Sequence, residues 1–332
     1  MAKLTLKQRR LIRQQHVLRL KLETKLQSEM RKFFKRYAAN LSNFYQQVGF
    51  TYFDATAKQE LKVILKRHYW RVARLFKDQA RSNGSKYHRM LLEKKDFLSE
   101  AITNIDSRIK IRLEEYFEEV ATEKADQITS TTESEISDYI ARVLSAASAD
   151  GLQLDRLQVA NLIRTFYFRR AESRARSVAI TETTRTMEET KLTEIEELFD
   201  ELDEDQLDEL GEGMDREELI AEIESLLAVS GADVDIDVEE IADSIDPEDI
   251  AAAGGIAAIV AALTVTKTWV ATLDDQTREA HAEADGQTVG LDEPFNVDGE
   301  DLEYPGDDAG DIANTINCRC SVIYGIGGAD EA

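Results

Sequence analysis

Residues 267–320 read KTWVATLDDQTREAHAEADGQTVGLDEPFNVDGEDLEYPGDDAGDIANTINCRC, and this stretch decides the fold of the C-terminal part of the chain. Both cysteines, one of the two tryptophans and two of the three prolines in the 332-residue sequence fall within it. Its patterning predicts strands over residues 267–272 and 317–324 and a helix over 275–284. Turns rich in Gly, Pro and Asp connect these segments, so we expect a small α+β module.

The rare residues of this stretch follow one another in a distinctive order. The order is Trp269, Asp275, Arg278, His281, Gly286, Phe295, Pro305, Gly306, Asp307, Asn317, Cys318, Arg319 and Cys320. It closely resembles the C-terminal module of phage Mu F-like minor head proteins, which form the phage head morphogenesis family. Asp308 stands where that family commonly has a second proline, which changes the rigidity of the turn.

A second element of the same family lies upstream. Thr181 and Glu182, with the residues before them, resemble the family's Ile-Ala-Arg-Thr-Glu helix, and Ile180 stands where Arg is usual. The resemblance covers roughly residues 125–186 and 265–325, with an insertion between the two parts.

The resemblance implies a minor head protein of a tailed phage or prophage. Such a protein is present in few copies inside the procapsid and head, beside the portal, and assists head morphogenesis and the packaging or ejection of DNA. The implied partners are the portal protein, capsid or scaffolding proteins and packaged double-stranded DNA. The implied location is the virion, inside the head, and the host cytoplasm during assembly.

The composition favours helices, because the chain holds only 3 Pro and 16 Gly. Apolar residues at intervals of three or four predict helices over about 4–48, 55–81, 87–125, 130–147 and 154–168, and a further one around Thr181-Glu182. The expected fold class is mainly α, with an elongated helical N-terminal region and a small C-terminal α+β module. We expect four parts: a basic helical arm or bundle at 1–125, a helical segment with the Thr-Glu motif at 126–187, an acidic helical insertion at 188–264 and the compact module at 265–332.

Charge is distributed unevenly along the chain, whose formal net charge is −24. Residues 1–100 contain 24 Lys and Arg against 8 Asp and Glu, whereas the remainder contains 17 against 57. A basic helix can neutralise DNA phosphates without reading sequence, or it can pack through its apolar seam. Both roles stay open for the candidate DNA contacts Arg9, Arg10, Arg13, Arg31, Lys32, Lys35 and Arg36.

The acidic block at 188–250 holds 27 Asp and Glu against Lys191 and Arg216. Its spaced leucines and isoleucines predict acidic amphipathic helices. Their surface is solubilising, mimics the charge of DNA, binds a basic partner or binds the basic arm of a neighbouring subunit. The Asp233, Asp235 and Asp237 run lacks the glycine and closing glutamate of an EF-hand calcium loop.

His281, Cys318 and Cys320 are the candidate metal ligands. In a strand, residues two apart share a face at about 6.6 Å, so both thiols can point at one ion. Three roles stay open: core packing with hydrogen bonding, a structural zinc site completed by an acid such as Asp275, and a reactive or redox role.

No other site in the sequence predicts catalysis. We find no Gly-rich phosphate loop, nucleophile elbow or paired zinc-binding His motif, so we expect no enzyme and no cofactor. Asp275 and Arg278 are expected to form an ion pair, and Trp269 and Phe295 to be core or docking aromatics. Glu182 is expected to act as a cap or as a hydrogen-bond anchor between the helical part and the C-terminal module.

The alternatives are a phage-encoded enzyme or toxin-related protein and a non-specific DNA-binding protein. Only twelve residues follow Cys320, which argues against a downstream effector. The apolar run at 250–264 is shorter than the roughly 20 residues that span a bilayer, so we expect no membrane partner. Two cysteines and no signal-peptide pattern favour a soluble protein of a reducing cytoplasm or of the inside of a particle.

Overall fold

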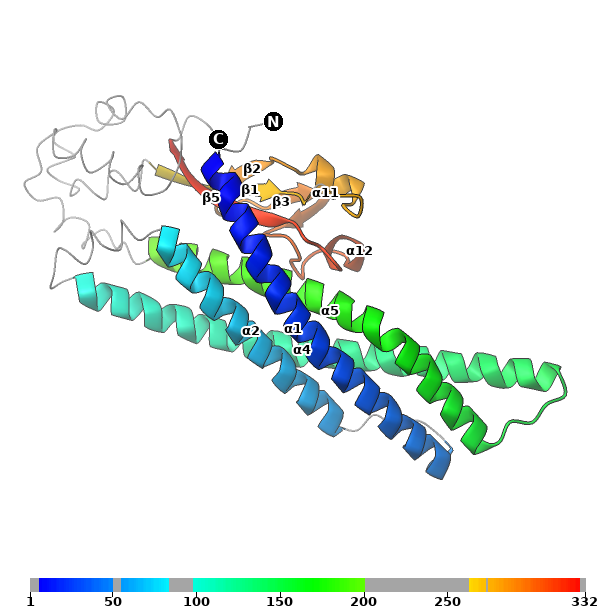
Figure 1. The fold of residues 1–332 in the computed structure, drawn as a ribbon. Helices are drawn as coiled ribbons and strands as arrows, with labels where there is room; N and C mark the ends of the chain where they lie inside the picture. The colour runs from blue at the N-terminus through cyan, green and yellow to red at the C-terminus, as the bar shows by residue number, and fades with distance from the viewer. Residues whose placement is uncertain (1–5, 50–54, 84–97, 201–262, 273, 329–332) are drawn as a thin grey trace, which may run out of the picture. The chain divides into compact units, whose positions relative to one another are not determined.

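The computed structural model describes residues 6–49, 55–83, 98–200, 263–272 and 274–328 (Figure 1). Its long helices are α1 (Leu6–Val48), α2 (Ala55–Asn83), α4 (Leu98–Ala149) and α5 (Arg156–Asp200). The C-terminal part contains strands β1 (Leu263–Val270), β2 (Thr288–Gly290), β3 (Phe295–Val297), β4 (Glu300–Leu302) and β5 (Ser321–Gly328), with short helices α11 (Glu279–Glu283) and α12 (Ile312–Thr315). The chain is therefore mainly α with a small C-terminal α+β module, as predicted.

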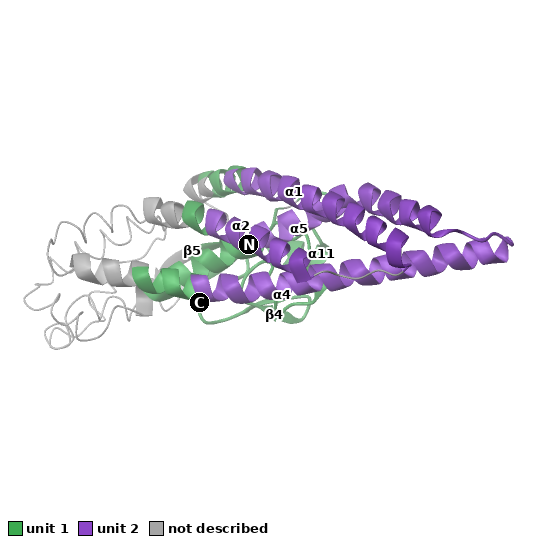
Figure 2. Cartoon of the chain, turned by 90° about the horizontal axis from the view of Figure 1, so that it is seen from below, with its two compact units in different colours: residues 1–17, 73–113, 184–332 green, residues 18–72, 114–183 purple. Residues whose placement is uncertain are grey.

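Packing divides the chain into two compact units (Figure 2). Unit 1 comprises residues 1–17, 73–113 and 184–332, and unit 2 comprises residues 18–72 and 114–183.

Unit 2 is a bundle of helical segments whose core follows the predicted apolar spacing. On α1 the buried side chains recur every three or four residues, at Leu22, Leu26, Met30, Phe33, Tyr37 and Leu41. On α2 they are Leu61, Leu65, Tyr69 and Val72. The segments of α1 and α5 are joined by polar contacts, because Ser42 donates to the Ala160 carbonyl at 2.8 Å and Arg31 pairs with Glu172 at 3.3 Å.

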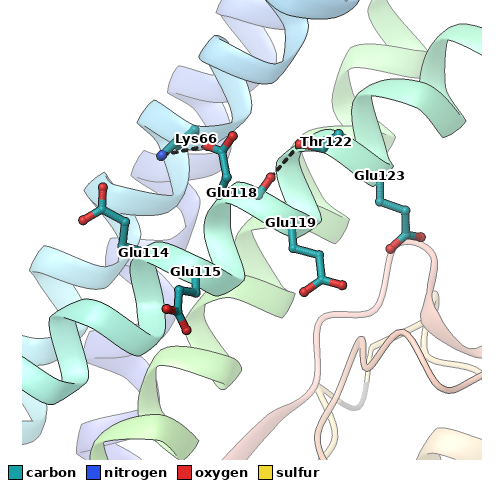
Figure 3. A pocket seen from close by; sticks show the side chains of 7 residues that line it. All are labelled: Lys66, Glu114, Glu115, Glu118, Glu119, Thr122 and Glu123. Atoms are coloured by element: carbon teal, nitrogen blue, oxygen red, sulfur yellow. Dashed lines mark hydrogen bonds and ion pairs between the residues drawn. The ribbon is translucent and has the colours of Figure 1, made fainter.

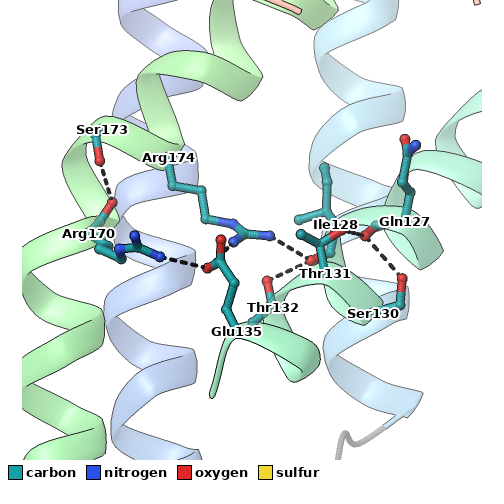
Figure 4. Close-up of polar contacts among 9 residues, drawn as sticks. All are labelled: Gln127, Ile128, Ser130, Thr131, Thr132, Glu135, Arg170, Ser173 and Arg174. Atoms are coloured by element: carbon teal, nitrogen blue, oxygen red, sulfur yellow. Dashed lines mark hydrogen bonds and ion pairs between the residues drawn. The ribbon is translucent and has the colours of Figure 1, made fainter. Parts of the chain in front are cut away.

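The helix start predicted at Ser130 is wrong, since α4 runs through this position without a break. Hydroxyl groups that commonly cap helices are here bonded within α4: Thr131 donates to the Gln127 carbonyl at 2.7 Å, and Thr132 donates to the Ile128 carbonyl at 2.6 Å (Figure 4). From α5, Arg174 pairs with Glu135 at 2.7 Å and donates to the Ile128 carbonyl, which joins the α4 and α5 segments across the Thr-rich stretch.

The helices predicted at 154–168 and around Thr181-Glu182 form the single helix α5. Its start is a capping box: the Asp155 carboxylate accepts from the Gln158 N–H at 2.7 Å, and the Gln158 side chain accepts from the Asp155 N–H at 2.9 Å.

The C-terminal module, within unit 1, contains a three-stranded antiparallel sheet in the order β2-β1-β5 and a β3-β4 hairpin. In the sheet, Trp269 of β1 lies opposite Val322 of β5, and Lys267 lies opposite Val289 of β2 and Tyr324 of β5. The helix predicted over 275–284 is shorter, because residues 274–277 form a turn in which the Asp274 carboxylate accepts from the Gln276 N–H.

Predictions for residues 201–262, including most of the acidic insertion, its helices and the Asp233–Asp237 run, lie outside the described residues. Among the helices that the structure does describe, none combines the length and apolar character that crossing a bilayer requires.

Candidate functional site

The core of the C-terminal module is built around two aromatic side chains. Trp269 on β1 and Phe295 on β3 are each 0% exposed, and their rings meet edge to face with centroids 5.4 Å apart. The edge of His281 also meets Trp269, at 5.6 Å between centroids. The surrounding buried residues are Leu192, Ala271, Ala284, Val297, Leu302, Tyr304, Cys318, Cys320 and Val322.

His281, Cys318 and Cys320 come together inside this core. The Nδ1 atom of His281 lies 3.4 Å from the sulfur of Cys320 and 3.5 Å from that of Cys318. All three side chains are buried, and their possible ligand atoms lie within 4.8 Å of one another. The hydrogen bond from Cys318 and the facing His281 ring lower the pKa of the Cys320 thiol to about 5. The same thiol–thiol hydrogen bond, with burial, raises the pKa of Cys318.

The remaining charged residues of the motif bind neighbouring loops. Arg319 forms a bidentate ion pair with Asp274, with nitrogen–oxygen distances of 2.6 and 2.7 Å. Arg278 donates to the Ile316 carbonyl. The predicted ion pair between Asp275 and Arg278 is therefore wrong. Asp275 is exposed in the turn before α11, and its neighbour Asp274 forms the ion pair, with Arg319. Asp275 also does not join the histidine and cysteine cluster among the described residues.

Three residues of the motif adopt the left-handed backbone region. Gly306 has φ +88°, and Asn317 has φ +56°, a conformation that asparagine tolerates better than most residues. The Pro305-Gly306-Asp307 turn is held by Asp307, whose carboxylate accepts from the N–H groups of Glu303 at 2.8 Å and Ala309 at 3.0 Å. Gly286, with φ +79°, donates its N–H to the Trp269 carbonyl at 2.8 Å, which returns the chain from α11 to the sheet.

The C-terminal half of α5 is attached to the module by polar side chains. Thr184 donates to the Cys318 carbonyl at 2.9 Å, and Arg185 donates to the Gly306 carbonyl at 3.2 Å. Arg185 also pairs with Asp308 at 3.0 Å, so the aspartate found in place of a proline supplies an ion pair to this turn.

A buried ion pair makes the second attachment. Lys191 pairs with Glu188 at 2.6 Å and donates to the Val322 carbonyl at 2.8 Å. Glu188 is 0% exposed and accepts from the Ser321 hydroxyl at 2.8 Å and the Val322 N–H at 3.1 Å. Both charged groups of this pair therefore have partners at the start of β5.

Sequence patterning missed these α5 residues because they are polar and buried together. Residues 181–188 are all buried, although the stretch holds four threonines, two glutamates and an arginine. A helix with an apolar stripe is found by its periodicity, whereas this segment has a buried polar face without such a stripe. The one available indication is compositional, since threonine is otherwise disfavoured in helices.

In unit 2, Glu182 lies in the interior of α5, so it does not cap a helix. Its carboxylate accepts from the Tyr69 hydroxyl at 2.6 Å. Next to it, Thr183 contacts Nε2 of His68 at 2.9 Å, and His68 is 0% exposed. Burial, Arg71 and Lys25 together lower the His68 pKa from 6.5 to about 3.

The candidate DNA contacts differ in their exposure and in whether they pair with an acidic side chain. Arg9, Arg10 and Arg13 are exposed on α1 in unit 1. In unit 2, Arg31 and Arg36 pair with Glu172 and Glu60. Lys32 and Lys35 are exposed, and the Lys35 ammonium lies 5.7 Å from the centre of the Phe168 ring. Arg164 of α5, which was not among the predicted DNA contacts, has its guanidinium carbon 5.6 Å from the centre of the same ring.

Negatively charged side chains lie together on α4, where glutamates line a shallow depression (Figure 3). Lys62 and Lys66 of α2 both reach Glu118, and their hydrogen bonds lower its pKa to about 2. The other lining residues are Glu114, Glu115, Glu119, Thr122 and Glu123.

One family model matches part of the chain. The model of the Phage Mu protein F like family matches residues 200–323, so this region is similar to that family. The match includes residues 201–262, which belong to the predicted insertion, and does not reach the Thr181-Glu182 element.

One curated relative shares a short segment with the chain. The NAD(+)--arginine ADP-ribosyltransferase EFV of Enterococcus faecalis is 36% identical over 66 residues, which is 20% of this chain and only 13% of that protein. No solved structure matches.

Proposed function

We propose that this chain, with its Mu F-like region at 200–323, is a minor head protein of a tailed phage or prophage that acts beside the portal, inside the head. The family match carries the proposal. The motif residues support a structural role in place of a catalytic one, because Trp269, His281, Phe295 and both cysteines are enclosed in the core of the module. The portal protein and capsid or scaffolding proteins are the proposed partners.

Quantitative mass spectrometry of purified particles tests this location. We expect a few copies per portal in DNA-filled heads. Loss of the protein from emptied heads would add ejection with the genome to its role. Absence from procapsids, filled heads and emptied heads alike would refute the proposal.

We further propose that unit 2 contacts packaged double-stranded DNA through Lys32, Lys35 and Arg164, here called the basic seam. These cations are exposed on neighbouring segments of α1 and α5, and two of them flank the half-exposed Phe168 ring. Cations in this arrangement bind phosphates without base readout, and each neutralised phosphate steepens the salt dependence of the affinity.

The test compares two full-length variants that lose the same charge. Replacing Lys32, Lys35 and Arg164 with Gln removes the seam, whereas replacing Lys58, Lys62 and Lys66 with Gln removes cations that already pair with Asp126 and Glu118. In the seam variant alone, we expect the log–log salt slope of DNA binding to become shallower by about 0.9 for each phosphate that the protein no longer neutralises. Equal slopes in the two variants would refute the DNA contact.

The activity named for the Enterococcus faecalis relative is the rival function. We propose that the present chain does not carry it, since the shared segment covers 13% of that protein. Incubation with NAD⁺ and an arginine-rich acceptor should transfer no ADP-ribose. Transfer that depends on this chain would replace the morphogenesis proposal with an enzymatic one.

A further inference from the structure

We propose that His281, Cys318 and Cys320 bind a zinc ion within the C-terminal module. The inference is independent of the proposed role in the phage head, because it concerns how the module is held together. Zinc takes imidazole nitrogen and thiolate sulfur as ligands, and these are the donor atoms that the structure brings to one point.

The spacing of the donor atoms fits a tetrahedral ion. Zinc lies about 2.0–2.1 Å from nitrogen and about 2.3 Å from sulfur, so a tetrahedral angle separates a nitrogen from a sulfur ligand by roughly 3.5 Å. The observed distances from Nδ1 of His281 are 3.4 Å to Cys320 and 3.5 Å to Cys318. Both nitrogen–sulfur distances therefore have the length that one shared zinc ion requires.

The backbone around the two cysteines is held by hydrogen bonds of its own carbonyl and N–H groups. The Cys318 carbonyl accepts from Thr184, and the Cys318 N–H donates to the Thr315 carbonyl at 3.3 Å. Between the cysteines, the Arg319 carbonyl accepts from the Thr272 hydroxyl at 2.6 Å. Ligands held in this way lose little freedom on binding an ion, which favours affinity.

The orientation of His281 points to the same site. Its Nε2 atom is buried without a hydrogen-bond partner among the described residues, so the polar interactions of the ring run through Nδ1, toward the two sulfurs. The Trp269 edge contact holds the plane of the imidazole. An ion at Nδ1 would lie beside both buried sulfur atoms, so that its positive charge would offset the charge of the thiolates that form when zinc displaces the thiol protons.

The described residues supply three ligands, which leaves the fourth tetrahedral position for a water molecule or another donor. Such an ion would connect α11 with the segment that enters β5. It would thereby join the two ends of the motif across the Trp269 core.

Cobalt substitution gives the sharpest test, because the 65 acidic residues of the chain can hold zinc loosely elsewhere. We expect the full-length protein to bind zinc after removal of loose metal by a weak chelator. With Co²⁺ in its place, we expect thiolate-to-cobalt absorption in the near ultraviolet. Cys318→Ser with Cys320→Ser should remove both the retained zinc and this absorption. Absence of the absorption from the folded wild-type protein would overturn the proposal.

A core variant separates the loss of ligands from the loss of folding. Val322→Ala weakens the same core without removing a donor atom, so it should keep the cobalt absorption while it lowers the melting temperature. Thiol titration gives a second readout, since zinc should slow the modification of both cysteines and a strong chelator should restore it. Cysteines that react at the same rate with and without zinc would refute coordination.

Discussion

Acidification should destabilise unit 2 through His68. This side chain is buried within unit 2, with Thr183 at one ring nitrogen and the cationic groups of Arg71 and Lys25 nearby. Burial and these two cations lower its pKa to about 3, whereas the unfolded chain has the ordinary value of 6.5. Between these values the unfolded chain binds a proton that the folded protein excludes, so stability falls as pH falls below 6.5.

The size of the effect follows from the two pKa values. Each pH unit below 6.5 costs about 1.4 kcal/mol, and lowering the pH from 7 to 5 therefore costs about 2 kcal/mol through this one residue. His68→Gln keeps a polar side chain that can bond to Thr183 but cannot take up a proton in this range.

Urea unfolding, followed by far-ultraviolet circular dichroism at pH 7 and pH 5, measures the contribution. Carboxylates and other histidines affect wild type and variant equally, so the difference between the two proteins isolates His68. We expect the wild type to lose about 2 kcal/mol more than His68→Gln across this interval. Parallel losses in the two proteins would show that His68 is protonated in the folded state and would refute the reasoning.

Two further predictions concern the C-terminal module. Gly306→Ala should lower the free energy of unfolding by about 1–2 kcal/mol, because φ +88° is strained for a residue with a side chain, and Gly290→Ala is the control without a positive φ; equal effects in urea unfolding would contradict this. Lys191→Met should cost about 3–5 kcal/mol, because it leaves Glu188 charged and buried, whereas Lys191→Met with Glu188→Gln should cost less; a double variant less stable than the single one would count against the buried pair.

The extent of the helices followed largely from the sequence, since the apolar stripes of α1 and α2 reappear as buried residues such as Leu26 and Leu65. The positions at which helices begin and end did not follow from the sequence. Ser130 and its neighbouring threonines are good capping residues in isolation, but in α4 their hydroxyls bond to carbonyls one turn earlier. Local propensity therefore predicted a helix boundary at Ser130 that is absent from the packed helix α4.

The candidate site was predictable in its membership and less so in its pairings. The pattern from Trp269 to Cys320 indicated a compact module, and its aromatic and sulfur-containing members lie in one core. Which acid pairs with Arg319 depends on loop geometry, and which side chains of α5 attach to β5 depends on residues more than 100 positions apart. Periodicity carries no information about such pairings.

The order of the strands has a consequence for the timing of folding during synthesis. β1 is the central strand of its sheet, but it pairs with β2 over only three residue positions and with β5 over eight. About 50 residues after β1 must therefore be translated before β5 can pair with it. Glu188 and Lys191 are synthesised before β1, so the delay until they can bond to Val322 is longer still. The core around Trp269 includes Val322 of β5, so we expect the module to fold late, after residue 322 has left the exit tunnel.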